Sequence, residues 1–332
     1  MSRGLPGTVL VTGATGFLGG HLCAALLARG VAVRGLVRGA GARLPPGAEP
    51  VQARGLDDVA GLSAAVRGVQ GVVHLAAHVH RPAAGGDDAA FHRVNVEGTR
   101  TLLREAITAG VRDFVFASSV KAVGERSEAP WDESTPAVPL DAYGRTKLEA
   151  EAIVRSLAEE QGLHAPILRL PLVYGPGMKG NALRLFRLVD RCVPLPLGSV
   201  RNRRSLLFSG NLAAALLATL ESPSGSGTFF VSDAERPSTP ELVTAIARAL
   251  GRPARLLPVP VGLLRAAGRG GDLLARALPF PLTTGAVDRL VASLEVDAGR
   301  LTRCTGFTPP YALADGLRLT ADWYTSRLAS RR

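Results

Sequence analysis

The sequence predicts an α/β fold: a Rossmann-type doubly wound parallel sheet with a smaller, irregular α/β substrate domain. Two observations support this expectation. Short apolar runs rich in β-branched residues alternate with stretches of helical periodicity through the first half of the chain, and a glycine-rich turn follows the first of these runs. Strands that alternate with helices form parallel sheets, whose faces are covered by helices through right-handed crossovers.

Each expected element has a local signal. The apolar runs predict buried strands at residues 8–12, 32–37, 49–53, 72–76, 114–117 and 165–170, with one more at 228–232. Apolar residues three and four positions apart predict helices at residues 17–29, 94–109, 142–161, 211–220 and 239–250.

The regular alternation gives way to proline- and glycine-rich sequence after residue 172. We therefore expect a Rossmann domain over residues 1–172, to which residues 206–232 return. Residues 173–205 and 233–328 are expected to form the second, substrate-binding domain.

The positive charge of the chain comes from arginine. The 332 residues carry a net charge of +11, and Lys121, Lys147 and Lys179 are the only lysines among 39 basic residues. The arginines are scattered and aromatic residues make up 5%, so we expect no nucleic-acid partner, which needs a stacking surface. A cleft that focuses this field on a small anion, such as a nucleotide diphosphate, suits the composition better.

Cysteine usage and hydropathy bear on the compartment. Cys23, Cys192 and Cys304 are odd in number and far apart, which argues against a disulfide framework or a zinc site and indicates a reducing cytosol. Three histidines fall within residues 74–80, but no carboxylate-rich sequence accompanies them, so no metal is expected. Since no window holds about 18 apolar residues, we expect a cytoplasmic protein that neither crosses nor enters a membrane.

A glycine-rich loop lies between the first expected strand and the first expected helix. Gly13 allows a tight turn, Gly16 lets backbone approach a pyrophosphate, and Gly19 lets the helix pack closely on the sheet. This placement favours a dinucleotide site over an ordinary glycine turn, with contacts from the loop itself: Gly13, Thr15, Gly16, Phe17, Leu18 and Gly19.

The second expected strand bears on the choice of dinucleotide. An NAD site usually carries an acidic residue at the end of this strand to bind the adenosine ribose, but residues 33–38 contain no carboxylate. Arg38 stands there instead and suits a 2′-phosphate, which favours NADP over NAD. The alternative is that Arg38 is a solvated arginine after a strand.

Candidate catalytic residues surround the start of the helix expected at 142–161. Tyr143 and Lys147 lie one turn apart on one face, and an ammonium ion near a tyrosine stabilises its phenolate. Ser119 follows the strand expected at 114–117, and the carboxyl ends of parallel strands face the ligand crevice of such folds. The three residues therefore predict an acid–base site.

In combination these motifs resemble the extended short-chain dehydrogenase/reductase superfamily, the NAD-dependent epimerase/dehydratase family. The resemblance covers nearly the whole chain, and bacterial UDP-N-acetylhexosamine C4 reductases and 4-epimerases of surface polysaccharide biosynthesis are the most similar branch. It rests on motifs in a fixed order: the glycine loop at 13–19, His74-Leu-Ala-Ala77, Asn95-Val-Glu-Gly98-Thr99, Ser118-Ser119, Tyr143-x-x-x-Lys147, and the segment 169–177.

The resemblance implies roles for individual residues. Ser119 and Tyr143 would hydrogen-bond the reacting oxygen, Tyr143 would move the proton, and Lys147 would lower the tyrosine pKa and hold the nicotinamide ribose. The remaining cofactor contacts would be Leu75, Ala76, Ala77 and Asn95, with Asn95 also supporting the active-site helix. Nucleotide-sugar contacts would come from His80, Ser119, Lys121, Asn181, Arg204 and Arg289. The family also implies a homodimer. An asparagine that the family places after Arg169 is Leu172 here.

The interpretation at this stage is an NAD(P)-dependent nucleotide-sugar oxidoreductase acting at C4. A 4-ketoreductase, with Tyr143 as proton donor, is favoured by the missing acidic residue after the second strand. A UDP-sugar 4-epimerase with tightly bound NAD uses the same residues. Further alternatives are a reductase of a hydrophobic ketone and a non-enzymatic dinucleotide-sensing protein.

Overall fold

The computed structural model describes residues 3–79, 88–222, 224, 226–274 and 283–329. Their central feature is a seven-stranded parallel sheet in the order β3-β2-β1-β4-β5-β6-β9. All seven expected strands are found, with ends shifted by at most two residues: β1 (Thr8–Thr12), β2 (Ala32–Val37), β3 (Glu49–Gln52), β4 (Gly71–His74), β5 (Asp113–Ser119), β6 (Pro166–Leu170) and β9 (Gly227–Phe230). The predicted Rossmann-type α/β class is confirmed.

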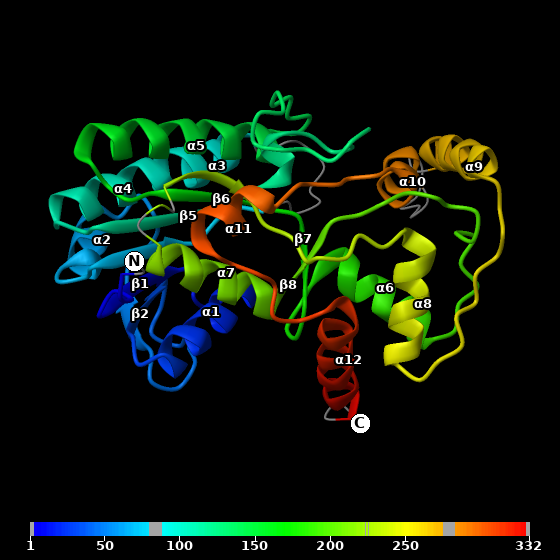
Figure 1. Cartoon of the computed structure of the whole chain (residues 1–332), viewed down its shortest axis with the longest axis horizontal. Coiled ribbons are helices and arrows are strands. Elements are labelled where there is room, and N and C mark those ends of the chain that lie inside the picture. The colour runs from blue at the N-terminus through cyan, green and yellow to red at the C-terminus, as the bar shows by residue number, and fades with distance from the viewer. Residues whose placement is uncertain (1–2, 80–87, 223, 225, 275–282, 330–332) are drawn as a thin grey trace.

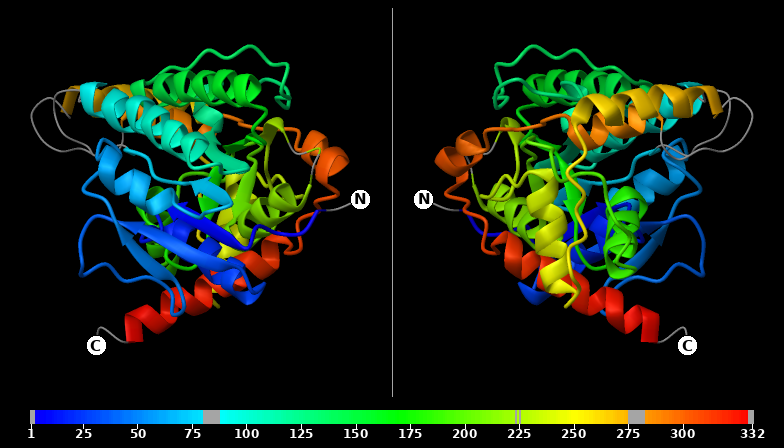
Figure 2. Two further views of the ribbon diagram at one scale, coloured as in Figure 1. Left: turned by 90° about the vertical axis from the view of Figure 1, so that its left-hand side faces the viewer. Right: turned by 90° about the vertical axis from the view of Figure 1, so that its right-hand side faces the viewer.

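Helices cover both faces of this sheet (Figures 1 and 2). Alternate residues of a strand face opposite ways, so Val9 and Val11 pack toward one layer and Leu10 toward the other. The first layer holds α1 (Phe17–Ala28), α7 (Ser209–Glu221) and α11 (Gly299–Thr305). The second holds α2 (Val59–Val66), α4 (Gly98–Thr108) and α5 (Ala142–Gln161). Burial on both faces explains why the strands are apolar without alternation.

The helix expected at 94–109 differs from the structure. Helical backbone begins earlier, at α3 (Asp88–His92), continues through a π-helical turn at Arg93–Glu97, and only then enters α4. Asn95 lies in the π turn and its side chain bonds His78 and Thr146 outside the helix. The wider turn thus accommodates a buried side-chain network that helical periodicity cannot reveal.

The remaining elements surround a separate apolar cluster. The short strands β7 (Leu172–Tyr174) and β8 (Leu206–Phe208) pair in parallel beside the main sheet. Around them lie α6 (Gly180–Asp190), α8 (Thr239–Ala249), α9 (Val261–Leu274), α10 (Thr284–Val291) and α12 (Leu313–Ala329) (Figure 1). Residues 206–232 supply β8, α7 and β9, of which β9 pairs with β6 at the sheet edge. The division of the chain into domains stays a prediction.

Among the described residues, no helix combines the length and apolarity that a membrane span requires.

Candidate active site

The glycine loop forms a tight turn between β1 and α1. Gly13 has a φ of +69°, and a Cβ there would lie 3.0 Å from the backbone nitrogen of Ala76. A Cβ on Gly19 would overlap the Gly13 carbonyl oxygen and the Cα of Ala14, so the helix could not approach the turn. Helix α1 begins after Gly16 without a side-chain cap, which leaves N–H groups of its first turn available to an anion.

Two other segments meet this loop. The backbone nitrogen of Ala76 donates to the Thr12 hydroxyl at 3.1 Å, so residues 75–77 pass directly beside the turn. In the segment that follows β7, Gly177 lies against the Phe17 ring. The Pro176 carbonyl oxygen of the same segment lies 2.6 Å from a ring nitrogen of His21. The close backbone approach, which only glycine permits, fits the pyrophosphate of a dinucleotide.

Arg38 is exposed one residue beyond the end of β2. The carboxylate of Asp58, at the N-terminus of α2, is already engaged. It caps α2 by accepting from the Gly61 nitrogen, and it accepts from the backbone and guanidinium of Arg54, which holds its pKa down at about 2. The structure thus offers Arg38 at the end of β2 where an NAD site usually has an acid.

Ser119 and Tyr143 lie together at the carboxyl edge of the sheet. Ser119 ends β5 and Tyr143 lies in the first turn of α5. Burial raises the pKa of Tyr143 to about 12, the neighbouring Ser119 side chain acts against this rise, and Asp141 adds to it. The Ser119 hydroxyl oxygen accepts a hydrogen bond from the Lys121 backbone nitrogen at 3.2 Å. Tyr143 needs a neighbouring cation to act near neutral pH.

Lys147 lies one turn further along α5. Its side chain is 2% exposed, and its Nζ lies 4.0 Å from the centroid of the Phe116 ring. Burial lowers the Lys147 pKa to about 7, while the Glu151 charge acts in the opposite direction. Lys147 also helps to keep His74 neutral, since burial and this ammonium lower the His74 pKa to about 3. His74 packs between Thr12 and Thr99.

Asn95 connects the β4 end to the catalytic helix. Its Oδ1 accepts from the His78 nitrogen at 2.7 Å, and its Nδ2 donates to the His78 carbonyl and the Thr146 hydroxyl. Both ends of the amide are used, so Asn95 joins the segment after β4 to α5 through hydrogen bonds.

Sequence reasoning missed four side chains around this site. The rings of His78 and Phe91 lie 4.9 Å apart, and Phe91 lies 6.3 Å from the Tyr143 ring, so His78 and Phe91 form one wall. Glu151 and Arg169 form a buried ion pair behind Lys147. Glu151 repeats the four-residue spacing of Tyr143 and Lys147, a signal that was available in the sequence.

The residues predicted to contact the substrate differ from one another in burial and in their hydrogen-bond and ion-pair partners. The Lys121 ammonium is paired with Glu125 at 3.0 Å and Asp141 at 2.5 Å, and Asp141 caps α5. Arg204 donates to the carbonyls of Arg289 and Ala292, so these arginines belong to neighbouring segments. Asn181 is exposed in the first turn of α6, and the Arg289 side chain is exposed on α10. His80 lies outside the described residues.

Leu172 lies beyond the end of β6, two residues after Leu170, whose Cα is paired with that of Ser119. Its side chain is 44% exposed at this edge. An apolar side chain therefore stands where the resemblance implied an amide.

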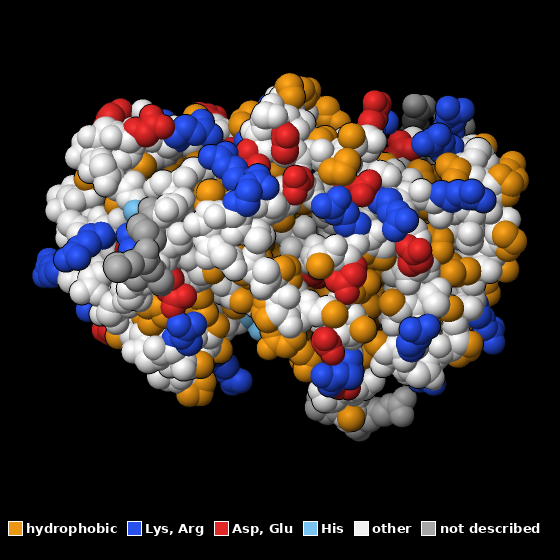
Figure 3. Space-filling view, in the orientation of Figure 1, with side chains coloured by type: hydrophobic (Ala, Val, Ile, Leu, Met, Phe, Trp, Pro, Cys, Tyr) orange, Lys and Arg blue, Asp and Glu red, His pale blue; other side chains and the backbone are white. Residues whose placement is uncertain are grey.

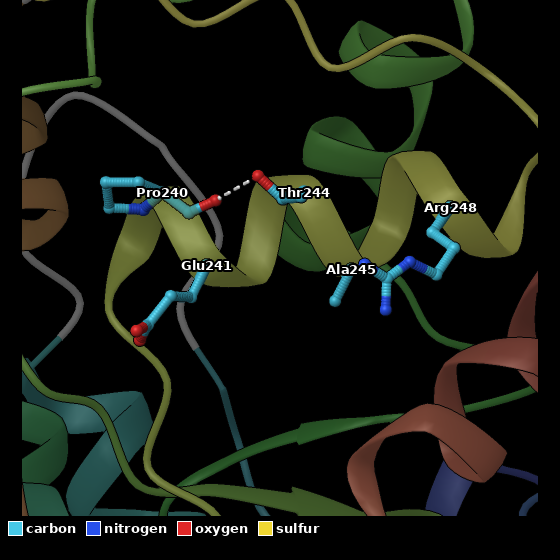
Figure 4. Close-up of a pocket in the computed structure, with 5 residues that line it drawn as sticks. All are labelled: Pro240, Glu241, Thr244, Ala245 and Arg248. Atoms are coloured by element: carbon cyan, nitrogen blue, oxygen red, sulfur yellow. Dashed lines mark hydrogen bonds between the residues drawn. The ribbon is translucent and has the colours of Figure 1, made fainter.

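The charged surface and one further pocket lie outside this arrangement of residues. Lys and Arg side chains are spread over the face shown in Figure 3, among Asp and Glu, and do not gather in one patch. A shallow pocket on one face of α8 is lined by Pro240, Glu241, Thr244, Ala245 and Arg248 (Figure 4). Within the described part of the chain, none of the predicted site residues lines this pocket.

Comparisons with known proteins agree with the fold and the motif order. The model of the family described as "NAD dependent epimerase/dehydratase family" matches residues 9–231. The chain is 33% identical to a UDP-glucose 4-epimerase of Vibrio cholerae over 96% of both chains. It is 27% identical to an N-acetyl-alpha-D-glucosaminyl-diphospho-ditrans,octacis-undecaprenol 4-epimerase of Escherichia coli, over 95% of this chain and 94% of the other. The structure of a Thermus thermophilus UDP-glucose 4-epimerase with NAD superposes with a TM-score of 0.75, at 26% identity, covering 96% of this chain and 99% of that one.

Proposed function

The chain belongs to the NAD dependent epimerase/dehydratase family, and on that premise we propose that it is a 4-epimerase of a UDP-hexose or UDP-N-acetylhexosamine. One observation carries the proposal. The side chains of Ser119 and Tyr143 are neighbours at the carboxyl edge of the sheet, and Lys147 follows Tyr143 by one turn. The Vibrio cholerae relative, similar along its whole length, supports C4 of a UDP-sugar as the reacting position.

The proposed chemistry assigns one task to each of these residues. The glycine loop at 13–19 would hold a nicotinamide dinucleotide, which would supply hydride transfer from and back to C4 of the sugar. Tyr143, as phenolate, accepts the proton of the C4 hydroxyl in the first half and gives it back in the second. The Ser119 hydroxyl orients the same oxygen, and the Lys147 charge stabilises the phenolate.

A 4-ketoreductase is the second candidate, and Arg38 is the observation that favours it. An exposed guanidinium at the end of β2 suits the 2′-phosphate of NADPH. A ketoreductase would bind NADPH and release NADP in each turnover, whereas the epimerase would keep its NAD tightly bound. In this case Tyr143 acts only as the acid that protonates the new alkoxide. The catalytic residues are the same, so the dinucleotide distinguishes the two candidates.

We assign binding of the substrate diphosphate to Arg204 and Arg289. Arg204 and Arg289 belong to neighbouring segments, and a guanidinium suits a diphosphate because it forms bidentate, charge-assisted hydrogen bonds. Asn181, Lys121 and the undescribed His80 complete the proposed substrate contacts. The predicted homodimer and cytosolic location stay predictions.

The test begins with the purified protein. It is denatured, any released dinucleotide is identified, and native protein is incubated with UDP-glucose and with UDP-N-acetylglucosamine without added cofactor. Released NAD and formation of the C4 epimer support the epimerase. An empty protein that consumes NADPH only with a 4-keto nucleotide sugar supports the second candidate. Absence of dinucleotide binding in both forms contradicts both.

A further inference from the structure

A buried ion pair lies directly behind the catalytic lysine. Glu151 is 0% exposed and Arg169 is 5% exposed. The Arg169 Nη2 donates to Glu151 Oε2 at 2.8 Å, and its Nε donates to Oε1 at 3.1 Å, so the contact is bidentate. The Ser118 hydroxyl also donates to Oε1, at 2.5 Å. Three donors on two strands therefore hold one carboxylate of α5.

This carboxylate lies on the catalytic face of the helix. Tyr143, Lys147 and Glu151 follow one another at four-residue intervals, so they lie in one row along α5. The partners of Glu151 come from the strands beneath, since Ser118 of β5 and Arg169 of β6 are paired in register. Ser118 directly precedes Ser119, so the contact ties the helix of Tyr143 to the strand end of Ser119.

The groups around Lys147 explain why an anion is needed there. The Phe116 ring faces the ammonium from β5, and His74 faces it from β4 as a neutral imidazole. Tyr143 and Glu151 face it from its own helix, and Arg169 adds a second cation behind Glu151. Removing the Glu151 charge would leave two buried cations together without a counter-ion, which strongly favours a neutral lysine.

We propose that Glu151 is a positioning residue of this site: its carboxylate, held by Arg169 and Ser118, keeps the Lys147 ammonium charged and fixes α5 against the strand that carries Ser119. The catalytic consequence rests on the proposed function, whereas the effect on Lys147 holds in the free protein. An experiment can therefore contradict the proposed function without contradicting the effect of Glu151 on Lys147, and the reverse.

The chain offers a direct readout because it has only three lysines. Protein made with [13Cε]lysine gives three resonances, and a Lys147→Arg variant assigns the one of interest. We expect the free protein to show a Lys147 midpoint near pH 7, the value that burial and Glu151 together set. Glu151→Gln is expected to lower this midpoint by about one pH unit or more. Glu151→Asp, which keeps the charge, is expected to restore much of the difference.

Glu149→Gln is the matched control. Glu149 lies on the same helix but is exposed and pairs with His92 on the surface, so the same substitution there should leave the Lys147 midpoint within about 0.2 units. If Glu151→Gln does not fold, a Glu151→Gln/Arg169→Met double variant avoids a lone buried charge. Its midpoint is also expected to fall, because Glu151 is the neighbour that raises the Lys147 pKa.

A midpoint that stays at the wild-type value, or rises, in a folded Glu151 variant overturns the proposal. Activity supplies the second readout. Since the charged lysine is the active form, kcat/KM falls as the pH rises through the Lys147 pKa, and Glu151→Gln moves this fall to lower pH. A one-unit shift makes the loss about tenfold above both midpoints and small below them. A merely structural role would lower kcat/KM equally at every pH.

Discussion

The two sides of the candidate site differ in how firmly their side chains are held. On the Rossmann side, Lys147 and Glu151 are buried, and the Glu151 carboxylate accepts hydrogen bonds from Ser118 and Arg169. On the side of the predicted substrate contacts, Arg289 and Asn181 are exposed, and Arg204 donates to backbone carbonyls. The first region is arranged before any ligand arrives, as acid–base chemistry requires. The second is open, so its ligand contacts depend on the substrate.

The largest effect is expected from removing the Tyr143 hydroxyl. Tyr143→Phe eliminates the proposed acid–base group and should lower kcat by about 10²- to 10⁴-fold, while dinucleotide affinity stays within about twofold. Steady-state kinetics and a dinucleotide titration measure the two quantities. Tyr311→Phe removes a hydroxyl from a partly exposed ring that packs on Phe208, and it should leave kcat unchanged. Equal losses in the two variants would contradict the assignment.

The glycine loop gives the next largest effect. Gly19→Ala places a methyl group into the Gly13 carbonyl, which should weaken dinucleotide binding by at least about tenfold and destabilise the fold by about 1–3 kcal/mol. Gly20→Ala is the matched control, because no atom lies within 4 Å of its added Cβ. Binding titration and thermal unfolding compare the two. If Gly19→Ala binds as tightly as Gly20→Ala, the loop is not the pyrophosphate site.

The open side is tested by Arg289→Ala. The exposed guanidinium supports little of the fold, so the variant should unfold like the wild type while KM for the UDP-sugar rises about tenfold. Arg248→Ala, at an exposed arginine of α8, should leave KM unchanged. An unchanged KM in both variants would remove Arg289 from the proposed diphosphate contacts.

The smallest effect concerns the choice of dinucleotide. Arg38→Ala should weaken NADP binding by about tenfold and leave NAD binding within about twofold, because only NADP carries the 2′-phosphate. The ratio of the two dissociation constants is the measurement. Equal changes for both dinucleotides would mean that Arg38 is an ordinary solvated residue.

How much the sequence predicts differs between the same two regions. Local signals suffice for the sheet and for α5, whose observed bounds, Ala142–Gln161, equal the expected ones. The buried strands can be recognised in the sequence as continuous apolar runs, because helices cover both faces of a parallel sheet. The position of Ser119 at the carboxyl edge of the sheet also follows from sequence, since the carboxyl ends of parallel strands lie at one edge.

Contacts between distant segments account for what the sequence does not predict. The ion pair of Glu151 and Arg169 joins a helix to a strand; the four-residue spacing places Glu151 on the face of Lys147, but it does not predict Arg169 as the partner. Asn95 in the π turn at Arg93–Glu97 bonds His78, a contact that no local pattern predicts. The pairing of Lys121 with Asp141 likewise joins residues on two segments, and no local pattern predicts it.

The most direct test of the account follows the C4 hydrogen itself. UDP-glucose carrying deuterium at C4 is incubated with the purified protein in ordinary water, without added cofactor, and the product is examined by mass spectrometry and NMR. The account predicts the C4 epimer with the deuterium retained, because the hydride leaves and returns within one active site. A product that has lost its deuterium to water, or no C4 epimer with any UDP-hexose or UDP-N-acetylhexosamine, would contradict epimerisation by hydride transfer at C4.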